Sequence, residues 1–302
     1  MLISQCLSGA TAVTKALNGD YILAANNGII LVKKNGIQKE LLKLDYRILD
    51  LTFNDSNIYG VGDNGTFIRS TDYGCTWEMT TLPTSGSIWS ICTNNNGTVV
   101  THGNYVLFLS SDFGKTWKIL HPFQSLLGNK PSIRSIFLDG QFVFVGTKVH
   151  QQHGGIWRID LQHFEMVRIK KDTRMVAAIL KHNQYIVSAT GTCRGFKGTV
   201  EYCHASISSS KQYQWEACES NCRERCYLDL SESEGFLYTT TSQDENGVGK
   251  VSRVYLDEKR IEPCAIVHGH GWRVSNQQNE FLVAGLYTSL YSNSVYQHLI
   301  QQ

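Results

Sequence analysis

Proline, charged residues and long apolar stretches are all scarce in this sequence. Only 4 of its 302 residues are proline and 18% are charged, a composition that argues against disorder. The net charge of +2 gives no general basis for binding nucleic acid or a membrane surface. Apolar runs are shorter than a membrane-spanning helix, and no basic segment with a long apolar one follows Met1. With Met1 as the native start we expect a cytoplasmic protein; the alternative is a leader that has been removed.

Helical periodicity is also nearly absent, and short alternating runs take its place. Hydrophobic residues make up 42% of the chain, enough for a large core. Residues 21–24, 98–101 and 142–146 are runs of this kind, and Asn-Gly and Asp-Gly turns punctuate the sequence. We therefore predict an all-β protein.

One octapeptide occurs twice. Residues 70–77 read STDYGCTW and residues 110–117 read SSDFGKTW, so each copy has the form Ser-x-Asp-x-Gly-x-Thr-Trp. This is the chemistry of a tight turn: carboxylate and hydroxyl groups satisfy turn amides, glycine takes a backbone conformation closed to other residues, and tryptophan packs on the next strand. A spacing near forty residues is the length of one four-stranded propeller blade.

The number of blades follows from short apolar runs that come after long connections. Seven such runs mark innermost strands, and they define units of roughly 36 to 50 residues. They start near Thr11, Arg47, Ile88, Arg134, Arg174, Arg225 and Arg273. We predict a single domain over residues 1–302, a seven-bladed β-propeller with four-stranded antiparallel blades. Six blades would follow if the first or last unit is not a complete blade. Strands from the two chain ends are expected to pair and close the ring.

The repeated turn resembles the Asp-box, or BNR repeat, of sialidase-like β-propellers. In that family the box closes the hairpin between the two outer strands of a blade, far from the ligand. The resemblance therefore implies Asp-boxes in blades 2 and 3 of a propeller, and it says little about activity.

Arginine recurs where the innermost strands of the predicted blades begin. The residues at this position are Arg47, Trp89, Arg134, Arg174, Arg225 and Arg273, although the chain has only 12 arginines. Innermost strands line the channel of a propeller, so we predict guanidinium groups around its mouth. Lys148, Arg194 and Lys197 would extend this positive rim from the long loops 148–155 and 190–198, and a third long loop, 242–250, is expected on the same face.

A ring of guanidinium groups suits an anion, because each planar fork meets carboxylate or phosphate oxygens in two parallel bonds. The alternative is that each arginine pairs with a nearby acid or carbonyl and ties blades together. Asp50, Asp229 and Glu224 are acids close enough in sequence to neutralise part of the charge.

Seven blades, an Asp-box that the other blades have lost, and these arginines look most like propellers similar to the photosystem II assembly and stability factor. Such propellers have an arginine patch on one face and bind protein without cleaving it. The resemblance implies a non-catalytic binding or assembly module for an anionic ligand: an acidic or C-terminal protein segment, a phosphorylated group or an acidic sugar. It implies no specific nucleic acid.

The alternative is a sialidase-type glycosidase acting on a carboxylated sugar. Residues 46–49 (YRIL) are similar to the Arg-Ile-Pro signature that opens sialidase domains, with leucine in place of proline. This resemblance implies that Arg47 binds the carboxylate together with Arg174 or Arg273. Asp63 would be the acid/base, and Tyr287 or Tyr291 the nucleophile. No glutamate is placed convincingly beside either tyrosine, and the blade count is one too many.

Five of the nine cysteines lie between residues 193 and 226. Several of them are expected on one rim with two histidines of the next blade. One alternative is that these side chains bind zinc or an iron–sulfur cluster. This set is Cys193, Cys218, Cys222, Cys226, His268 and His270. The spacing matches no standard motif, so we expect no cofactor. Disulfides and free thiols are the other possibilities, with Cys75 and Cys92 expected as thiols.

Overall fold

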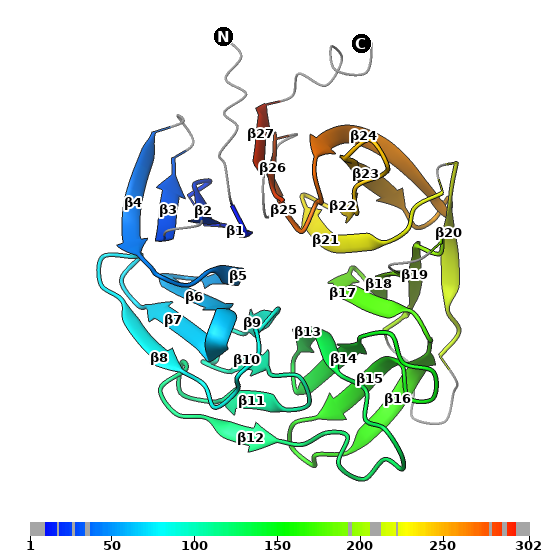
Figure 1. The fold of residues 1–302 in the computed structure, drawn as a ribbon, viewed down its shortest axis with the longest axis horizontal. Coiled ribbons are helices and arrows are strands. Elements are labelled where there is room, and N and C mark those ends of the chain that lie inside the picture. The colour runs from blue at the N-terminus through cyan, green and yellow to red at the C-terminus, as the bar shows by residue number, and fades with distance from the viewer. Residues whose placement is uncertain are drawn as a thin grey trace. The chain divides into compact units, whose positions relative to one another are not determined.

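The structure is a computed structural model. It describes residues 10–16, 18–25, 28–33, 37–192, 195–205, 213–221, 223–277, 280–285 and 289–293. Apart from a single 3-10 turn, Asp63–Gly65, all regular elements in these ranges are β-strands (Figure 1). The predicted all-β class is confirmed. No helix in the described part of the chain has the length and apolar character needed to cross a membrane.

The chain divides into two compact units. The N-terminal unit contains residues 14–175, and the C-terminal unit contains residues 176–302 together with the first 13 residues. Within each unit, strands that follow one another in a sheet mostly pair antiparallel, and the C-terminal unit has one parallel pair. The single domain expected over residues 1–302 stays a prediction.

The first four sheets each contain four strands. The first consists of β1 (Ala12–Lys15), β2 (Tyr21–Ala25), β3 (Gly28–Val32) and β4 (Gln38–Lys43). The second consists of β5 (Ile48–Asn54), β6 (Asn57–Gly62), β7 (Thr66–Ser70) and β8 (Glu78–Thr81). The third consists of β9 (Ile91–Thr93), β10 (Val99–His102), β11 (Leu107–Ser110) and β12 (Lys118–Leu120). The fourth consists of β13 (Ile133–Asp139), β14 (Phe142–Thr147), β15 (Gly155–Asp160) and β16 (Met166–Lys171).

The next eight strands form two further groups of four, joined through their last strands. The first group is β17 (Met175–His182), β18 (Tyr185–Gly191), β19 (Thr199–His204) and β20 (Glu216–Ser220). The second is β21 (Tyr227–Ser233), β22 (Phe236–Thr241), β23 (Val248–Tyr255) and β24 (Arg260–His268). A short parallel pairing of β20 with β24 links the two groups.

A three-stranded sheet follows, with β25 (Arg273–Gln277), β26 (Glu280–Ala284) and β27 (Ser289–Asn293). These strand groups have the size of propeller blades. The count of seven complete blades stays a prediction.

Successive sheets of the N-terminal unit bury apolar side chains between them. Tyr59 and Phe67 of the second sheet pack with Val99 and Phe108 of the third. Val100, next to Val99 in β10, belongs instead to the cluster between the third and fourth sheets, with Ile133, Val143 and Trp157. Side chains alternate between the faces of a strand, so each inner sheet contributes to two interfaces.

The repeated octapeptides form two matching turns, one between β7 and β8 and one between β11 and β12. Ser70 Oγ accepts a hydrogen bond from Gly74 N (2.8 Å), and the Asp72 carboxylate accepts bonds from Thr76 N (2.8 Å) and Thr76 Oγ1 (2.6 Å). Gly74 has φ +83°. The hydrogen bonds from Thr76 contribute most to lowering the pKa of Asp72 to about 2. The predicted turn chemistry is confirmed.

The second turn repeats these bonds. Gly114 N donates to Ser110 Oγ at 2.8 Å, and Thr116 N and Oγ1 donate to the Asp112 carboxylate at 2.9 and 2.7 Å. Both turns join the third strand of a sheet to the fourth, and their polar groups bind one another. They therefore stabilise the fold and offer little to a ligand.

Candidate functional site

The residues predicted to begin the first strand of each sheet are found there. Arg134 and Arg273 lie at the beginning of β13 and β25, and Arg47 and Arg174 immediately precede β5 and β17. Trp89 and Arg225 each come two residues before a first strand, β9 and β21. Their arrangement around one channel mouth stays a prediction. Their individual surroundings differ, and these differences define the candidate site.

Arg47 is bound to a neighbouring acid. Its Nε donates to Asp63 Oδ2 at 2.8 Å, and the other oxygen of that carboxylate accepts a hydrogen bond from Ser87 Oγ at 2.6 Å. Asp63, the predicted acid/base of the glycosidase alternative, is thus held between an arginine and a serine. Tyr287, its predicted nucleophile, lies outside the described residues, as do Cys193, Arg194 and Cys222.

Arg174 belongs to a tight ionic network. Its Nε and Nη2 donate to the two carboxylate oxygens of Asp172 at 2.9 and 2.6 Å, and Lys170 Nζ donates to the same carboxylate at 2.8 Å. Lys170 and Asp172 are both buried. Burial raises the pKa of Asp172, but the hydrogen bonds from Arg174 and the charge of Lys170 outweigh it and bring the pKa to about 2. The network fixes the guanidinium of Arg174 on a carboxylate. This matches the alternative in which each arginine pairs with a nearby acid.

The two arginines in the C-terminal unit also face acids. Arg273 Nη1 donates to Trp272 O at 3.0 Å and lies 3.7 Å from Asp229 Oδ1. Arg225 Nη2 lies 3.4 Å from Glu245 Oε1, and the Arg225 side chain is 39% exposed.

Glu224, considered as an acid that would neutralise an arginine, binds Lys250 instead. Its Oε1 lies 2.7 Å from Lys250 Nζ. The two residues are 26 positions apart in sequence, and folding of the β22–β23 hairpin brings the lysine to this carboxylate.

Arg134 has a different environment. Its side chain is buried, with 4% of the residue exposed, and its guanidinium carbon lies 5.3 Å from the centre of the Trp89 ring. Lys148 is a second cation nearby: burial is the larger cause that lowers its pKa, and the charge of Arg134 lowers it further. Lys148 Nζ donates to Asn104 Oδ1 at 3.3 Å. We call Trp89, Asn104, Arg134 and Lys148 the Arg134 cluster.

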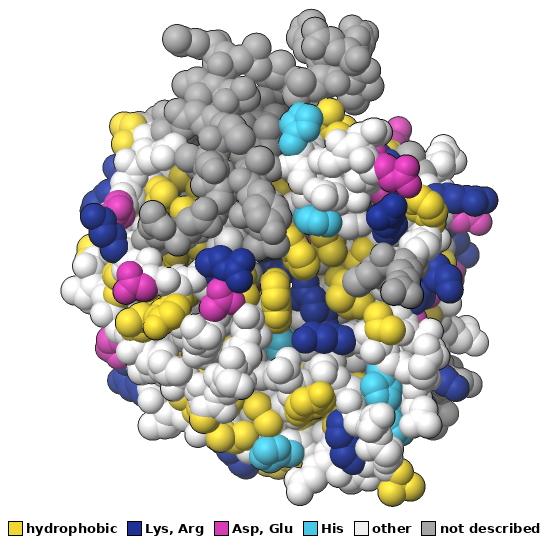
Figure 2. All heavy atoms as spheres, in the orientation of Figure 1, with side chains coloured by type: hydrophobic (Ala, Val, Ile, Leu, Met, Phe, Trp, Pro, Cys, Tyr) yellow, Lys and Arg dark blue, Asp and Glu magenta, His cyan; other side chains and the backbone are white. Residues whose placement is uncertain are grey.

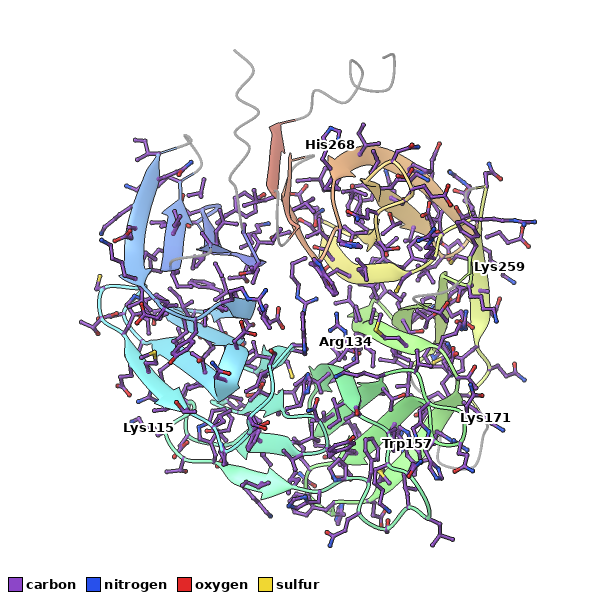
Figure 3. The ribbon with its side chains drawn as sticks, viewed as in Figure 1. Lys115, Arg134, Trp157, Lys171, Lys259 and His268 are labelled. Atoms are coloured by element: carbon purple, nitrogen blue, oxygen red, sulfur yellow. The ribbon has the colours of Figure 1, made fainter. Side chains whose placement is uncertain are left out.

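Backbone hydrogen bonds between the third and fourth sheets position this cluster. Ile133 N donates to Asn104 O at 2.7 Å, and Lys148 N donates to Ser132 O at 2.8 Å. The loop after β10, the start of β13 and the end of β14 are thereby fixed to one another. Figure 3 shows Arg134 at the inner end of β13, away from the outer strand β16. Figure 2 shows Lys and Arg side chains, in dark blue, on the face that this view draws.

Two like charges so close, one of them buried, cost free energy that an anion would offset. The guanidinium fork and the ammonium group are suited to carboxylate or phosphate oxygens. The sequence predicted Arg134 and Trp89 here and placed Lys148 on a positive rim. It did not point to Asn104, whose only signal is a turn-forming position in a Gly103-Asn104 pair.

Lys197 and the histidines are less informative. Lys197 and His268 are exposed, and His270 is half-buried. Burial lowers the pKa of His270, and its Nδ1 accepts a hydrogen bond from Gln243 N at 3.2 Å. His270 thus helps to hold the β22–β23 loop.

Two cysteines of the alternative metal-binding set, expected on one rim, are core residues. Cys218 packs with Val200 and Tyr202 because strand alternation turns it inward, and burial raises its pKa to about 12. Cys226 is buried, and its Sγ donates to Tyr227 O. Cys75, Cys92, Cys203, Cys218, Cys226 and Cys264 are thiols. Within the described ranges, no three His, Cys, Asp or Glu side chains come together as a metal site.

Comparisons with known proteins identify one close relative and many similar folds. No model of a known protein family matches the chain. It is 36% identical over 282 residues to YkuO, an uncharacterized protein of Bacillus subtilis (strain 168), covering 92% of this chain and 94% of that protein.

Among solved structures, the chain is similar to U3-55K, with a TM-score of 0.71 and 8% identity over 97% of this chain and 98% of that one. It is also similar to YCF48 from Cyanidioschyzon merolae, with a TM-score of 0.70 and 12% identity over 94% and 96%. A chain of the mitotic checkpoint complex matches with a TM-score of 0.71 and 8% identity over 96% and 93%. These likenesses show the fold, and they confirm a β-propeller.

Proposed function

The chain belongs to the protein family of YkuO from Bacillus subtilis, and we propose that it is a non-catalytic binding or assembly module that holds an anionic group at the Arg134 cluster. The group is an acidic or C-terminal segment of a protein partner, a phosphorylated group or an acidic sugar. The two repeated turns are, in this proposal, Asp-boxes that only support the fold.

The observation that carries this proposal is a buried arginine beside a second cation. Arg134 is almost fully buried, and the pKa of Lys148 is lowered first by burial and further by the charge of Arg134. Contact with the half-buried Trp89 ring holds the guanidinium in place. A preorganised pair of this kind binds an anion without first having to order its own side chains.

A protein partner is favoured by the fold. One of the similar propellers was solved as part of a complex, the mitotic checkpoint complex. Propellers present loops on one face around a rigid sheet scaffold, and loops on such scaffolds are where binding concentrates. In this chain the β14–β15 loop, which begins with Lys148, adjoins the cluster.

The test compares anion binding by the protein and by an Arg134→Gln variant. The probes are a fluorescein-labelled peptide of alternating aspartate and glutamate, inorganic phosphate and N-acetylneuraminic acid. We expect at least one probe to bind in a salt-dependent manner, and Arg134→Gln to weaken it roughly tenfold or more, which corresponds to about 1.4 kcal/mol. Lys148→Gln should weaken it less, because an ammonium provides a single point charge.

Arg158→Gln is the matched control. Arg158 also lies over an aromatic ring, 4.9 Å from the centre of Phe142 in the same unit, and it should leave binding unchanged. Arg134→Lys, which keeps the charge and loses the fork, covers the case in which the glutamine variant does not fold. Equal binding by the Arg134 variants and the unaltered protein would disprove the proposal, and turnover of a fluorogenic sialoside would replace it with glycosidase activity.

A further inference from the structure

We propose a second ligand site, in the C-terminal unit, that binds a small anion carrying a planar aromatic ring. The site is a pocket of about 290 Å³, which we call the Phe196 pocket. The residues that matter to the argument are Phe196, Arg223, Arg225, Ser242, Gln243 and Lys250, all of which line it. It shares no residue with the Arg134 cluster and does not depend on the proposed function.

Three connections of the chain form this pocket. Phe196 comes from the loop between β18 and β19, and Arg223 and Arg225 come from the segment between β20 and β21. Ser242 and Gln243 follow β22 directly. Backbone hydrogen bonds join these connections: Gly198 N donates to Glu224 O at 2.9 Å, and Ser242 N donates to Cys226 O at 2.9 Å. The walls are therefore fixed relative to one another before any ligand arrives.

One wall is an aromatic ring open to solvent. Phe196 is 56% exposed, and the guanidinium carbon of Arg225 lies 5.7 Å from its ring centre. A large exposed aromatic side chain beside a pocket is a stacking surface for a planar group. The neighbouring Arg225 adds a positive charge at the edge of that surface.

The acids of the pocket neutralise its lysine but only weakly its two arginines. Glu224 is buried and binds Lys250 at 2.7 Å. Asp244 accepts hydrogen bonds from the amides of its own turn, Asn246 N at 2.8 Å and Val248 N at 2.9 Å. The Glu245 side chain is 81% exposed, and its Oε1 lies 3.4 Å from Arg225 Nη2. Solvent screens an ion pair of this kind, so it is weak.

Arg223 adds a second guanidinium. It is exposed, and no ion pair of Arg223 occurs among the residues that the structure describes. Two guanidinium groups beside one aromatic ring match a ligand whose anionic group projects from a planar ring, since each fork meets a phosphate or carboxylate in two bonds.

Polar groups are present for the edge of such a ring. Gln243 lines the pocket with its amide. Ser242 also lines it, and its buried Oγ has no hydrogen-bond partner within the described residues. A buried hydroxyl without a partner costs free energy that a hydrogen-bonding ligand recovers. Nucleoside monophosphates and phosphotyrosine share the required chemistry of planar ring, polar edge and anionic group.

The test is calorimetric titration of the full chain with two complete probes, adenosine monophosphate and free phosphotyrosine. Two partial probes, adenosine and ribose 5-phosphate, carry the ring alone and the phosphate alone. We expect one complete probe to bind roughly tenfold or more tightly than either partial probe. The complete probe that binds identifies the source of the ring. Phe196→Leu and Arg225→Gln should each weaken it by roughly tenfold or more.

Phe236→Leu and Arg253→Gln are matched controls in the same unit. Phe236 is also exposed, and Arg253 lies 3.9 Å above its ring, but neither lines the Phe196 pocket. Both variants should bind as the unaltered protein does. Repeating the titrations in the Arg134→Gln background separates this site from the Arg134 cluster. The proposal is overturned if neither complete probe binds better than its parts, or if binding survives both Phe196→Leu and Arg225→Gln in folded variants.

Discussion

Arg134 and Arg174 stand at the starts of the first strands of two sheets that are consecutive in the chain. Arg174 is bound to a carboxylate, whereas Arg134 lies near a lysine. The difference begins two residues earlier. Asp172 precedes Arg174 and accepts two hydrogen bonds from its guanidinium, whereas Ser132 stands at the matching position before Arg134. A serine carries no charge, so Arg134 has no counterpart of the Asp172 carboxylate two residues before it.

At this residue scale we predict that Asp172→Asn strongly destabilises the protein. The substitution leaves Lys170 buried and removes the charge that balances it and Arg174. Breaking a buried ion pair in this way costs about 3–5 kcal/mol. Urea unfolding at pH 7 measures the loss, with Asp45→Asn, a change at an exposed aspartate, as the control. A loss no larger than that of the control would show that the network contributes nothing.

The same prediction includes a dependence on pH. The pKa of Asp172 is about 2 in the folded protein, below the value of roughly 3.9 of an unfolded aspartate. Its contribution is therefore fully present above about pH 4 and is lost as the pH falls toward 2. The difference between the protein and Asp172→Asn should shrink over that window.

At the scale of elements, side chains near the starts of first strands tie one sheet to the next. Asp50 Oδ2 of β5 accepts a hydrogen bond from Ile91 N at 2.9 Å, and Asp229 Oδ2 of β21 accepts one from Val274 N at 2.9 Å. Asp50 was considered as a counter-charge for arginine, and these bonds give it a role in joining strands. The role was not evident from sequence because the partner lies 41 residues away.

We predict that Asp50→Ala loosens the junction between β5 and β9. Without the carboxylate, the buried amide of Ile91 loses its acceptor, which costs about 1–3 kcal/mol. Hydrogen exchange measures the effect directly, and the Ile91 amide should exchange faster. Asp50→Asn keeps an acceptor oxygen and should preserve most of the protection. If Asp50→Ala leaves exchange at Ile91 unchanged, the side chain does not hold the strands together.

At the scale of the whole molecule, we predict that the two compact units unfold together. The boundary between the units divides strand β1 after Val13 and strand β17 after Met175, so neither unit has a complete set of strands by itself. Scanning calorimetry should therefore give one transition, with equal calorimetric and van't Hoff enthalpies. Asp172→Asn should shift the entire transition. Two transitions, of which Asp172→Asn moves only one, would contradict the single domain.

The sequence could predict the fold more completely than the site. Alternation and the repeated turns at 70–77 and 110–117 depend on neighbouring residues, and the structure confirms both. Arginine at first-strand positions was also visible. The sequence did not show whether such an arginine is bound to an acid, because the acid can lie far away along the chain. Asp63, for example, is 16 residues from Arg47. The position of Cys218 was also not evident from the sequence. The cysteine-rich segment was interpreted as a connection on the rim, whereas β20 includes Cys218 and its thiol is buried in the core.

Local chemistry in the sequence thus determined that this chain is made of strands and tight turns, since strand alternation and turn hydrogen bonds involve residues close in the chain. Tertiary structure decided which charges meet. Asn104 and Lys148 are 44 residues apart, and Phe196 reaches Arg225 across a complete hairpin. Electrostatic contacts depend on distance in space, and packing of sheet on sheet sets that distance only once the chain has folded.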